Sequence, residues 1–123
     1  MTALLSMKTK IVTPRVEATR DWYRDLFGLT VLEEWDDPGD RGCILGLHST
    51  AGEALLEIHH QSNESDFSGM GLQFRVDDVG AFEVPADKPF RSRGPVSRPW
   101  GSTYLFFSDP NGMQVVVFSG SSL

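Results

Sequence analysis

The sequence predicts an α+β fold in which two tandem βαβββ modules form curled sheets around a concave cavity, within one domain spanning residues 1–123. Three observations indicate it. One amphipathic helical segment follows a short apolar strand. Runs of β-branched and aromatic residues separated by turn sequences come next, and the same order restarts after residue 69. We place the first module at residues 7–62 and the second at residues 70–120, with a shortened helix.

The first module begins with a strand over residues 7–13, which Pro14 ends. A helix over residues 16–27 follows, and Gly28 is suited to its left-handed end. Its apolar residues recur four apart, which predicts one buried stripe consisting of Ala18, Trp22, Tyr23, Leu26 and Phe27. Strands are then expected over residues 29–35, 42–47 and 54–60, separated by turns at residues 36–40 and 49–52.

The second module repeats this order with less helix. A strand over residues 71–76 leads to Asp77 and Asp78, which can cap a short helical turn ending at Phe82 or Val84. Pro85 and Pro89 prevent a longer helix.

The end of the second module is predicted to be a hairpin. Residues 91–99 have an irregular, basic pattern, and strands over residues 103–108 and 113–118 follow. Asp-Pro-Asn-Gly at residues 109–112 joins them, because Asn-Gly tolerates the positive φ angles of a tight turn. Either module alone has too few strands to enclose a core, so the two sheets should be curled around a concave face.

Composition excludes several classes of function. Eleven basic and seventeen acidic side chains leave a net charge of −6, and no basic stripe carries interleaved aromatics, which argues against nucleic-acid binding. No apolar run approaches the roughly 20 residues of a membrane span. Cys43 is the single cysteine, so no internal disulfide can form. The apolar stretch near the N-terminus is too short for a signal peptide, which predicts a cytoplasmic location.

Five segments carry a family resemblance. They are TRDWYRDLFGL (19–29), ALLEI (54–58), FRVDDV (74–79), PWG (99–101) and DPNG (109–112). In this order and spacing the chain resembles the vicinal oxygen chelate superfamily, which includes glyoxalase I, extradiol dioxygenases, and fosfomycin- and bleomycin-resistance proteins. The pattern is most similar to the metal-lacking members that resemble bleomycin-resistance proteins. The resemblance implies the fold and a homodimer, but no particular activity.

The resemblance also implies where a metal would bind. Enzymes of the superfamily hold a divalent ion with one residue from the first and one from the fourth strand of each module, typically His or Glu. Here those positions fall near Lys8 or Thr9, and on Glu57, Gly71 and Val116. One carboxylate does not hold such an ion, so we expect neither a metal nor another cofactor.

A displaced metal site is the alternative. Glu57 and His59 are two residues apart on a strand and should point to the same face, with His48 or His60 as a further ligand. Such a site would take Zn, Ni, Mn or Fe, and Glu57 would be the candidate catalytic residue. No role can be assigned from sequence to Cys43, which sits in an apolar strand.

The remaining candidates are ligand-binding residues. Trp100, Trp35, Tyr104 and Phe106 can stack on planar or cationic ligands, with Glu57 and His59 beside them. Acidic residues that could attract a cation are Glu33, Glu34, Asp36, Asp37 and Asp40. Trp100 is the first choice, because Pro99 and Gly101 place it in irregular backbone.

Three functions are consistent with these residues. The preferred one is metal-independent binding or sequestration of a small molecule, cationic or aromatic, in an aromatic and acidic cavity, which would not be catalysis. A second is a metal-dependent lyase, isomerase or dioxygenase using Glu57 and relocated ligands. A third is a non-catalytic accessory protein whose cavity is closed by side chains. The sequence does not identify the ligand.

Overall fold

A computed structural model describes residues 1–49 and 52–121 of the chain. It divides into two compact units, Met1–Ser65 and Asp66–Leu123, which we call unit 1 and unit 2. Among the described residues, no helix combines the length and the apolar character that crossing a membrane requires.

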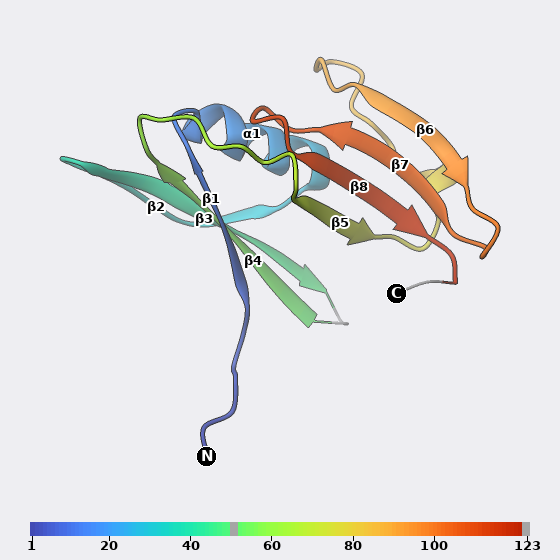
Figure 1. The fold of residues 1–123 in the computed structure, drawn as a ribbon, viewed down its shortest axis with the longest axis horizontal. Helices are drawn as coiled ribbons and strands as arrows, with labels where there is room; N and C mark the ends of the chain where they lie inside the picture. Colours follow the sequence, from blue (N-terminus) through green and yellow to red (C-terminus); the bar gives the residue numbers. More distant parts are fainter. Residues whose placement is uncertain (50–51, 122–123) are drawn as a thin grey trace. The chain divides into compact units, whose positions relative to one another are not determined.

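Unit 1 is a four-stranded sheet with one helix on one of its faces (Figure 1). The spatial order of its strands is β1-β4-β3-β2, with β1 parallel to β4 and the other pairs antiparallel. The elements in chain order are β1 (Lys8–Thr13), α1 (Val16–Phe27), β2 (Thr30–Asp37), β3 (Asp40–Ser49) and β4 (Gly52–His60). The β3–β4 turn expected at residues 49–52 includes residues 50 and 51, which lie outside the described part.

Unit 2 has the same plan, with the helix reduced to a single short turn, η1. Its strand order is β5-β8-β7-β6, with β5 parallel to β8. The elements are β5 (Gly71–Arg75), η1 (Val79–Ala81), β6 (Ser92–Ser97), β7 (Thr103–Ser108) and β8 (Gln114–Ser119). Asp78 caps η1 by accepting a hydrogen bond from the Gly80 backbone N–H at 2.9 Å. The two units therefore confirm the predicted pair of βαβββ modules.

The helix of unit 1 has the predicted bounds but a different buried stripe. Gly28 ends it with a left-handed φ of 69°. The buried residues are Val16, Thr19, Tyr23 and Leu26, spaced three and four apart so that they share one side of the helix. The prediction for the other positions was wrong: Ala18 is exposed, and Trp22 and Phe27 are only half-buried. A helix packed on a single sheet buries one narrow side, and Trp22 flanks it with its ring edge-on to Tyr23.

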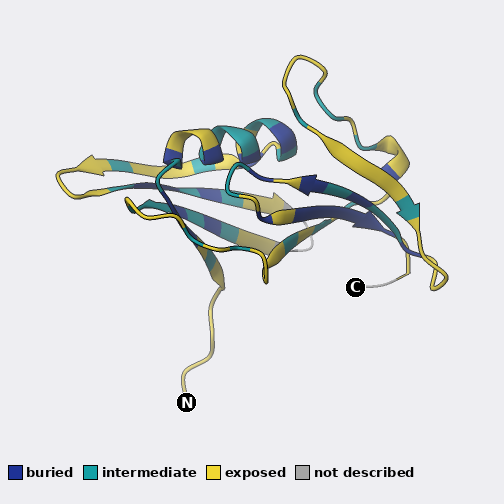
Figure 2. Ribbon diagram, turned by 45° about the horizontal axis from the view of Figure 1, so that its top comes forward, coloured by how far each residue is buried: buried dark blue, intermediate teal, exposed yellow. Residues whose placement is uncertain are grey.

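Strand β6 corrects the prediction that residues 91–99 are irregular. Residues 92–97 pair antiparallel with β7, and the register shifts between Arg93 and Val96. Gly94, with a φ of 107°, and Pro95 occupy this shift. An edge strand tolerates a bulge and a residue without an N–H because one of its sides has no ladder to complete. Figure 2 shows the result, an exposed β6 beside a partly buried β7, with the largely buried β8 next to β7.

The loop between β7 and β8 is a hairpin connection, but not the tight Asn-Gly turn that we predicted. Gly112 has a φ of 80°, and no described non-glycine residue has a positive φ, so Asn111 does not adopt the turn conformation expected of it. The Asp109 side chain organises the loop instead. Its Oδ1 accepts hydrogen bonds from the backbone N–H groups of Asn111 at 2.8 Å and Met113 at 3.0 Å.

Candidate functional site

One face of the unit 1 sheet packs against α1, and the opposite face carries three of the six ligand-binding residues predicted from the sequence, Trp35, Glu57 and His59. The register pairs Lys10 with Glu57 and Gly42 with both His59 and Trp35. Alternation along each strand therefore places these side chains on the face away from Ile58 and Leu45, both of which are fully buried. We call the side chains of Lys8, Lys10, Trp35, Glu57 and His59 the charged face of unit 1.

The Glu57 carboxylate forms ion pairs with two lysines, so it is not free to bind a metal or accept a proton from a substrate. Lys8 Nζ lies 2.8 Å from one carboxylate oxygen and Lys10 Nζ lies 3.8 Å from the other, and the Glu57 side chain is 14% exposed. The hydrogen bond from Lys8, with the positive charges of Lys8 and Lys10, holds the pKa of Glu57 below its ordinary value of 4.5. Glu57 is therefore ionised and paired at neutral pH, whereas a general base of raised pKa would need the opposite environment.

A pH titration of stability tests this pairing. Because the folded-state pKa of Glu57 is lowered, its contribution to stability is present above pH 4.5 and is lost as the pH falls through the folded-state pKa. We expect the free energy of unfolding of Glu57→Gln, measured with urea, to fall less between pH 6 and pH 3 than that of the wild type.

The matched control is Glu53→Gln, on the same strand, where the side chain is 67% exposed and faces His48. Its pH dependence should stay close to that of the wild type. Identical pH profiles for Glu57→Gln and the wild type would contradict the pairing.

Asp40 connects two of the predicted site residues. Its Oδ1 accepts a hydrogen bond from Trp35 Nε1 at 2.9 Å and lies 2.7 Å from His59 Nε2. The hydrogen bonds from His59 and Trp35 lower the pKa of Asp40. The sequence singled out Asp40 only as one acid of a run. Its role as a bridge depends on the β2–β3 hairpin, which brings the start of β3 beside Trp35.

The other candidates of unit 1 are dispersed. His48 has a side chain 83% exposed, with Nδ1 3.3 Å from a Glu53 oxygen. His60 is adjacent to His59 on β4 and so faces the other way. Cys43 is 1% exposed, and burial raises the pKa of its thiol to about 11, so a reactive thiolate does not form at neutral pH. In the acidic run, Glu34 forms an ion pair with Arg20 at 2.9 Å.

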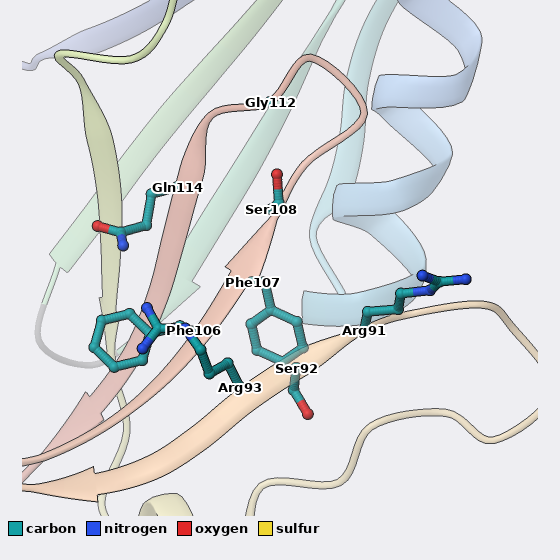
Figure 3. A pocket seen from close by; sticks show the side chains of 8 residues that line it. All are labelled: Arg91, Ser92, Arg93, Phe106, Phe107, Ser108, Gly112 and Gln114. Carbon is teal, nitrogen blue, oxygen red and sulfur yellow. The ribbon is translucent and has the colours of Figure 1, made fainter.

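Unit 2 holds a pocket of about 310 Å³ at the start of β6 and the end of β7 (Figure 3). Its lining is basic, polar and aromatic, and consists of Arg91, Ser92, Arg93, Phe106, Phe107, Ser108, Gly112 and Gln114. In Figure 3 the Arg93 guanidinium lies over the Phe106 ring, whereas Arg91 points away from it. The Arg93 Cζ is 4.2 Å from the Phe106 ring centroid.

Phe106 begins a row of stacked rings. Its centroid is 6.2 Å from that of Tyr104, which is 6.0 Å from that of Phe118. Arg98 Cζ lies 5.9 Å from the Tyr104 centroid. The register places these side chains on the face opposite Phe107 and Val117, and we call Tyr104, Phe106 and Phe118 the aromatic face of unit 2.

Two of the predicted ligand-binding residues, Tyr104 and Phe106, therefore lie side by side in unit 2. Trp100, the first choice from the sequence, is 58% exposed in the turn after β6 and is not among the residues lining this pocket. Sequence reasoning missed Arg93 and Gln114. The available signal was the basic composition of residues 91–99, which we interpreted as a loop.

The fold is accompanied by a family match over most of the chain. Residues 6–117 match the model of the Glyoxalase/Bleomycin resistance protein/Dioxygenase superfamily. The chain belongs to this superfamily. No curated protein matches the sequence.

Solved structures of the superfamily's fold are similar over nearly the whole chain. TnmS3, an antibiotic binding protein from Streptomyces sp. CB03234, is 21% identical with a TM-score of 0.74, over 98% of this chain and 99% of that one. A glyoxalase I mutant from Zea mays is 18% identical with a TM-score of 0.76, over 95% of this chain but 46% of that one. A putative glyoxalase family protein from Bacillus anthracis is 17% identical with a TM-score of 0.68, over 98% of both chains. At these identities the likeness shows the fold alone.

The metal positions expected of enzymes in this superfamily do not carry a fitting set of donors. Lys8 is a cation bonded to Glu57, Gly71 has no side chain, and Val116 is an aliphatic residue only 4% exposed. The register pairs Val116 with Gln73. Glu57 and His59 share a face as predicted, but each has a different partner. Within residues 1–49 and 52–121, no three His, Cys, Asp or Glu side chains cluster as metal ligands would.

Proposed function

We propose that this member of the superfamily binds a small molecule without a metal, and that the aromatic face of unit 2 is its binding surface. The observation that carries the proposal is the pocket beside Phe106, where an arginine lies over a half-buried aromatic ring. Aromatic and polar groups converging on a concavity of about 310 Å³ are typical of small-molecule sites. The similarity to TnmS3, described as an antibiotic binding protein, supports the same class of function.

The charged face of unit 1 supports a metal-dependent enzyme less well. A metal at Glu57 would have to displace Lys8 and Lys10 from the carboxylate. A cationic small molecule, expected from the acidic residues, remains a second proposal, and its site would be the acidic turn between β2 and β3. Asp36, Asp37 and Asp40 line a hollow of about 470 Å³ there.

A ligand screen with matched variants tests the proposal. Aromatic compounds of different charge are added to the purified protein, and its thermal midpoint is measured with and without EDTA. A compound that binds only the native state raises the midpoint. We expect stabilisation that EDTA leaves intact and that Phe106→Ala abolishes, while Trp35→Ala, in unit 1, retains it. Trp100→Ala tests the choice made from the sequence alone.

Two results would overturn the proposal. One is stoichiometric Zn, Ni, Mn or Fe in the purified protein that is lost on Glu57→Ala. The other is the absence of stabilisation by every compound tested, which would favour an accessory protein with a closed cavity.

We extend the proposal to a cytoplasmic homodimer, as the superfamily resemblance implies. Large apolar side chains that a partner could cover include Leu32, Met70 and Trp100, which are 54%, 55% and 58% exposed. Light scattering on the eluted protein should give twice the 13.7 kDa of one chain. A mass of one chain at micromolar concentration would refute the dimer.

A further inference from the structure

The sheet of unit 2 differs in charge from the rest of this acidic protein. The sequences of its four strands contain Arg75 and Arg93 but no aspartate or glutamate. The pocket lining likewise has two arginines and no acid. The net charge of −6 therefore comes from other parts of the chain. A ligand at this pocket meets a locally positive, aromatic surface.

Arg93 is placed so that its hydrogen-bonding edge remains available. Its guanidinium Cζ lies 4.2 Å from the Phe106 ring centroid, and this cation–π contact does not use the N–H groups of the guanidinium as hydrogen-bond donors to another group. Within the described part of the chain, no carboxylate lies within ion-pair distance of Arg93, and no hydrogen bond satisfies its donors. By contrast, four arginines of unit 1 form ion pairs with carboxylates, namely Arg15, Arg20, Arg24 and Arg41. The ion pair between Arg20 and Glu34, for example, has a distance of 2.9 Å.

The same pocket is lined by further donors. Gln114, on β8, is one of them, and its side-chain amide can donate to a ligand bound in the pocket. The Ser108 hydroxyl also lines the pocket. A planar fork of N–H donors with neighbouring neutral donors matches the two oxygens of a carboxylate. The Phe106 ring lines the pocket and can contact an aromatic ring attached to that carboxylate, and Tyr104, stacked on Phe106 outside the lining, can extend the aromatic surface.

We infer that the ligand of this pocket is an anionic aromatic compound, an aryl carboxylate whose carboxylate binds Arg93 and Gln114 while its ring lies along Phe106 and Tyr104. The inference rests on the proposed binding function and assigns a negative charge to the ligand. This charge is opposite to that of the cationic ligand expected from the acidic residues. A pocket of about 310 Å³ accommodates one or two fused rings.

Three probes that share a naphthalene ring and differ in charge test the inference. They are 2-naphthoate, neutral 2-naphthamide and the cationic (2-naphthyl)trimethylammonium ion, each titrated calorimetrically into the full chain. We expect 2-naphthoate to bind at least about tenfold more tightly than the other two, and its affinity to fall as salt is raised. Arg93→Gln should weaken 2-naphthoate about tenfold and leave 2-naphthamide unchanged, with Arg93→Lys intermediate.

The matched control is Arg24→Gln, which removes an arginine from the exposed side of α1 in unit 1 and should leave all three affinities unchanged. Circular dichroism confirms that each variant is folded. Equal or tighter binding of the neutral or cationic probe, or no effect of Arg93→Gln, would overturn the anionic assignment while the binding function stands. Failure of all three probes to bind would count against both.

Discussion

Replacing Tyr23 by alanine will lower the free energy of unfolding by about 3–5 kcal/mol, as expected for a large aromatic residue removed from a core. Tyr23 is 0% exposed at the centre of the buried stripe of α1, in the helix that packs against β3 and β4. Its removal leaves a cavity, because the close-packed side chains around it relax only in part. Urea denaturation of the wild type and the variant measures the difference.

Trp22→Ala is the matched control for this prediction, since it truncates a larger neighbouring ring that is only half-buried. We expect it to be clearly less destabilising than Tyr23→Ala. The four-residue spacing in the sequence led us to expect Trp22 in the core. A larger loss for Trp22→Ala than for Tyr23→Ala would therefore restore that interpretation and contradict the structure.

Asp109→Ala should lower the free energy of unfolding by about 2–4 kcal/mol, because it removes the acceptor for two backbone N–H groups at once. Asp109 is 5% exposed, and the Met113 N–H that it satisfies is itself buried. A buried donor left without a partner loses its hydration with no compensation. The thermal midpoint and the urea midpoint both report the change.

Asp109→Asn distinguishes the hydrogen bonds from the charge. Asparagine keeps a side-chain oxygen at the same place and should retain most of the stability that alanine loses. Asn111→Ala provides a second comparison, because the backbone N–H of residue 111 survives that change. If Asn111→Ala proved the more damaging variant, the Asn-Gly turn predicted from the sequence would describe the loop better than the Asp109 hydrogen bonds do.

The helix and most strands could be predicted because their signals are local. Gly28 ends α1 through its own left-handed backbone, and residues 103–108 form β7 because β-branched and aromatic side chains suit an extended chain. Strand β6 could not be predicted in this way. Gly94 and Pro95 locally predict an interruption of regular secondary structure. Residues 92–97 form a strand only because they pair with β7.

The candidate site shows the same division. Tyr104 and Phe106 were singled out from the sequence as aromatic residues in a strand that borders the concave face implied by the family resemblance, and the structure places both on one face of β7. Arg93 and Gln114 were not, since they meet Phe106 only after β6 and β8 have paired with β7 on either side of it. Glu57 was found as a residue, but its pairing with Lys8 and Lys10 depends on the parallel alignment of β1 with β4.

By itself the sequence determined the order of most elements, through residue identity and local spacing, and its motifs pointed to the family. The expectation that three of the four metal positions lack a suitable ligand came from that resemblance and stays a prediction. Only the tertiary structure decided two contacts between charged groups and rings: Arg93 lies over Phe106, and Asp40 lies between Trp35 and His59. It also decided that Tyr23 rather than Trp22 is in the core. Such contacts join residues far apart in the chain or select among adjacent ones, and neither outcome is set until the sheets pair and the helix packs.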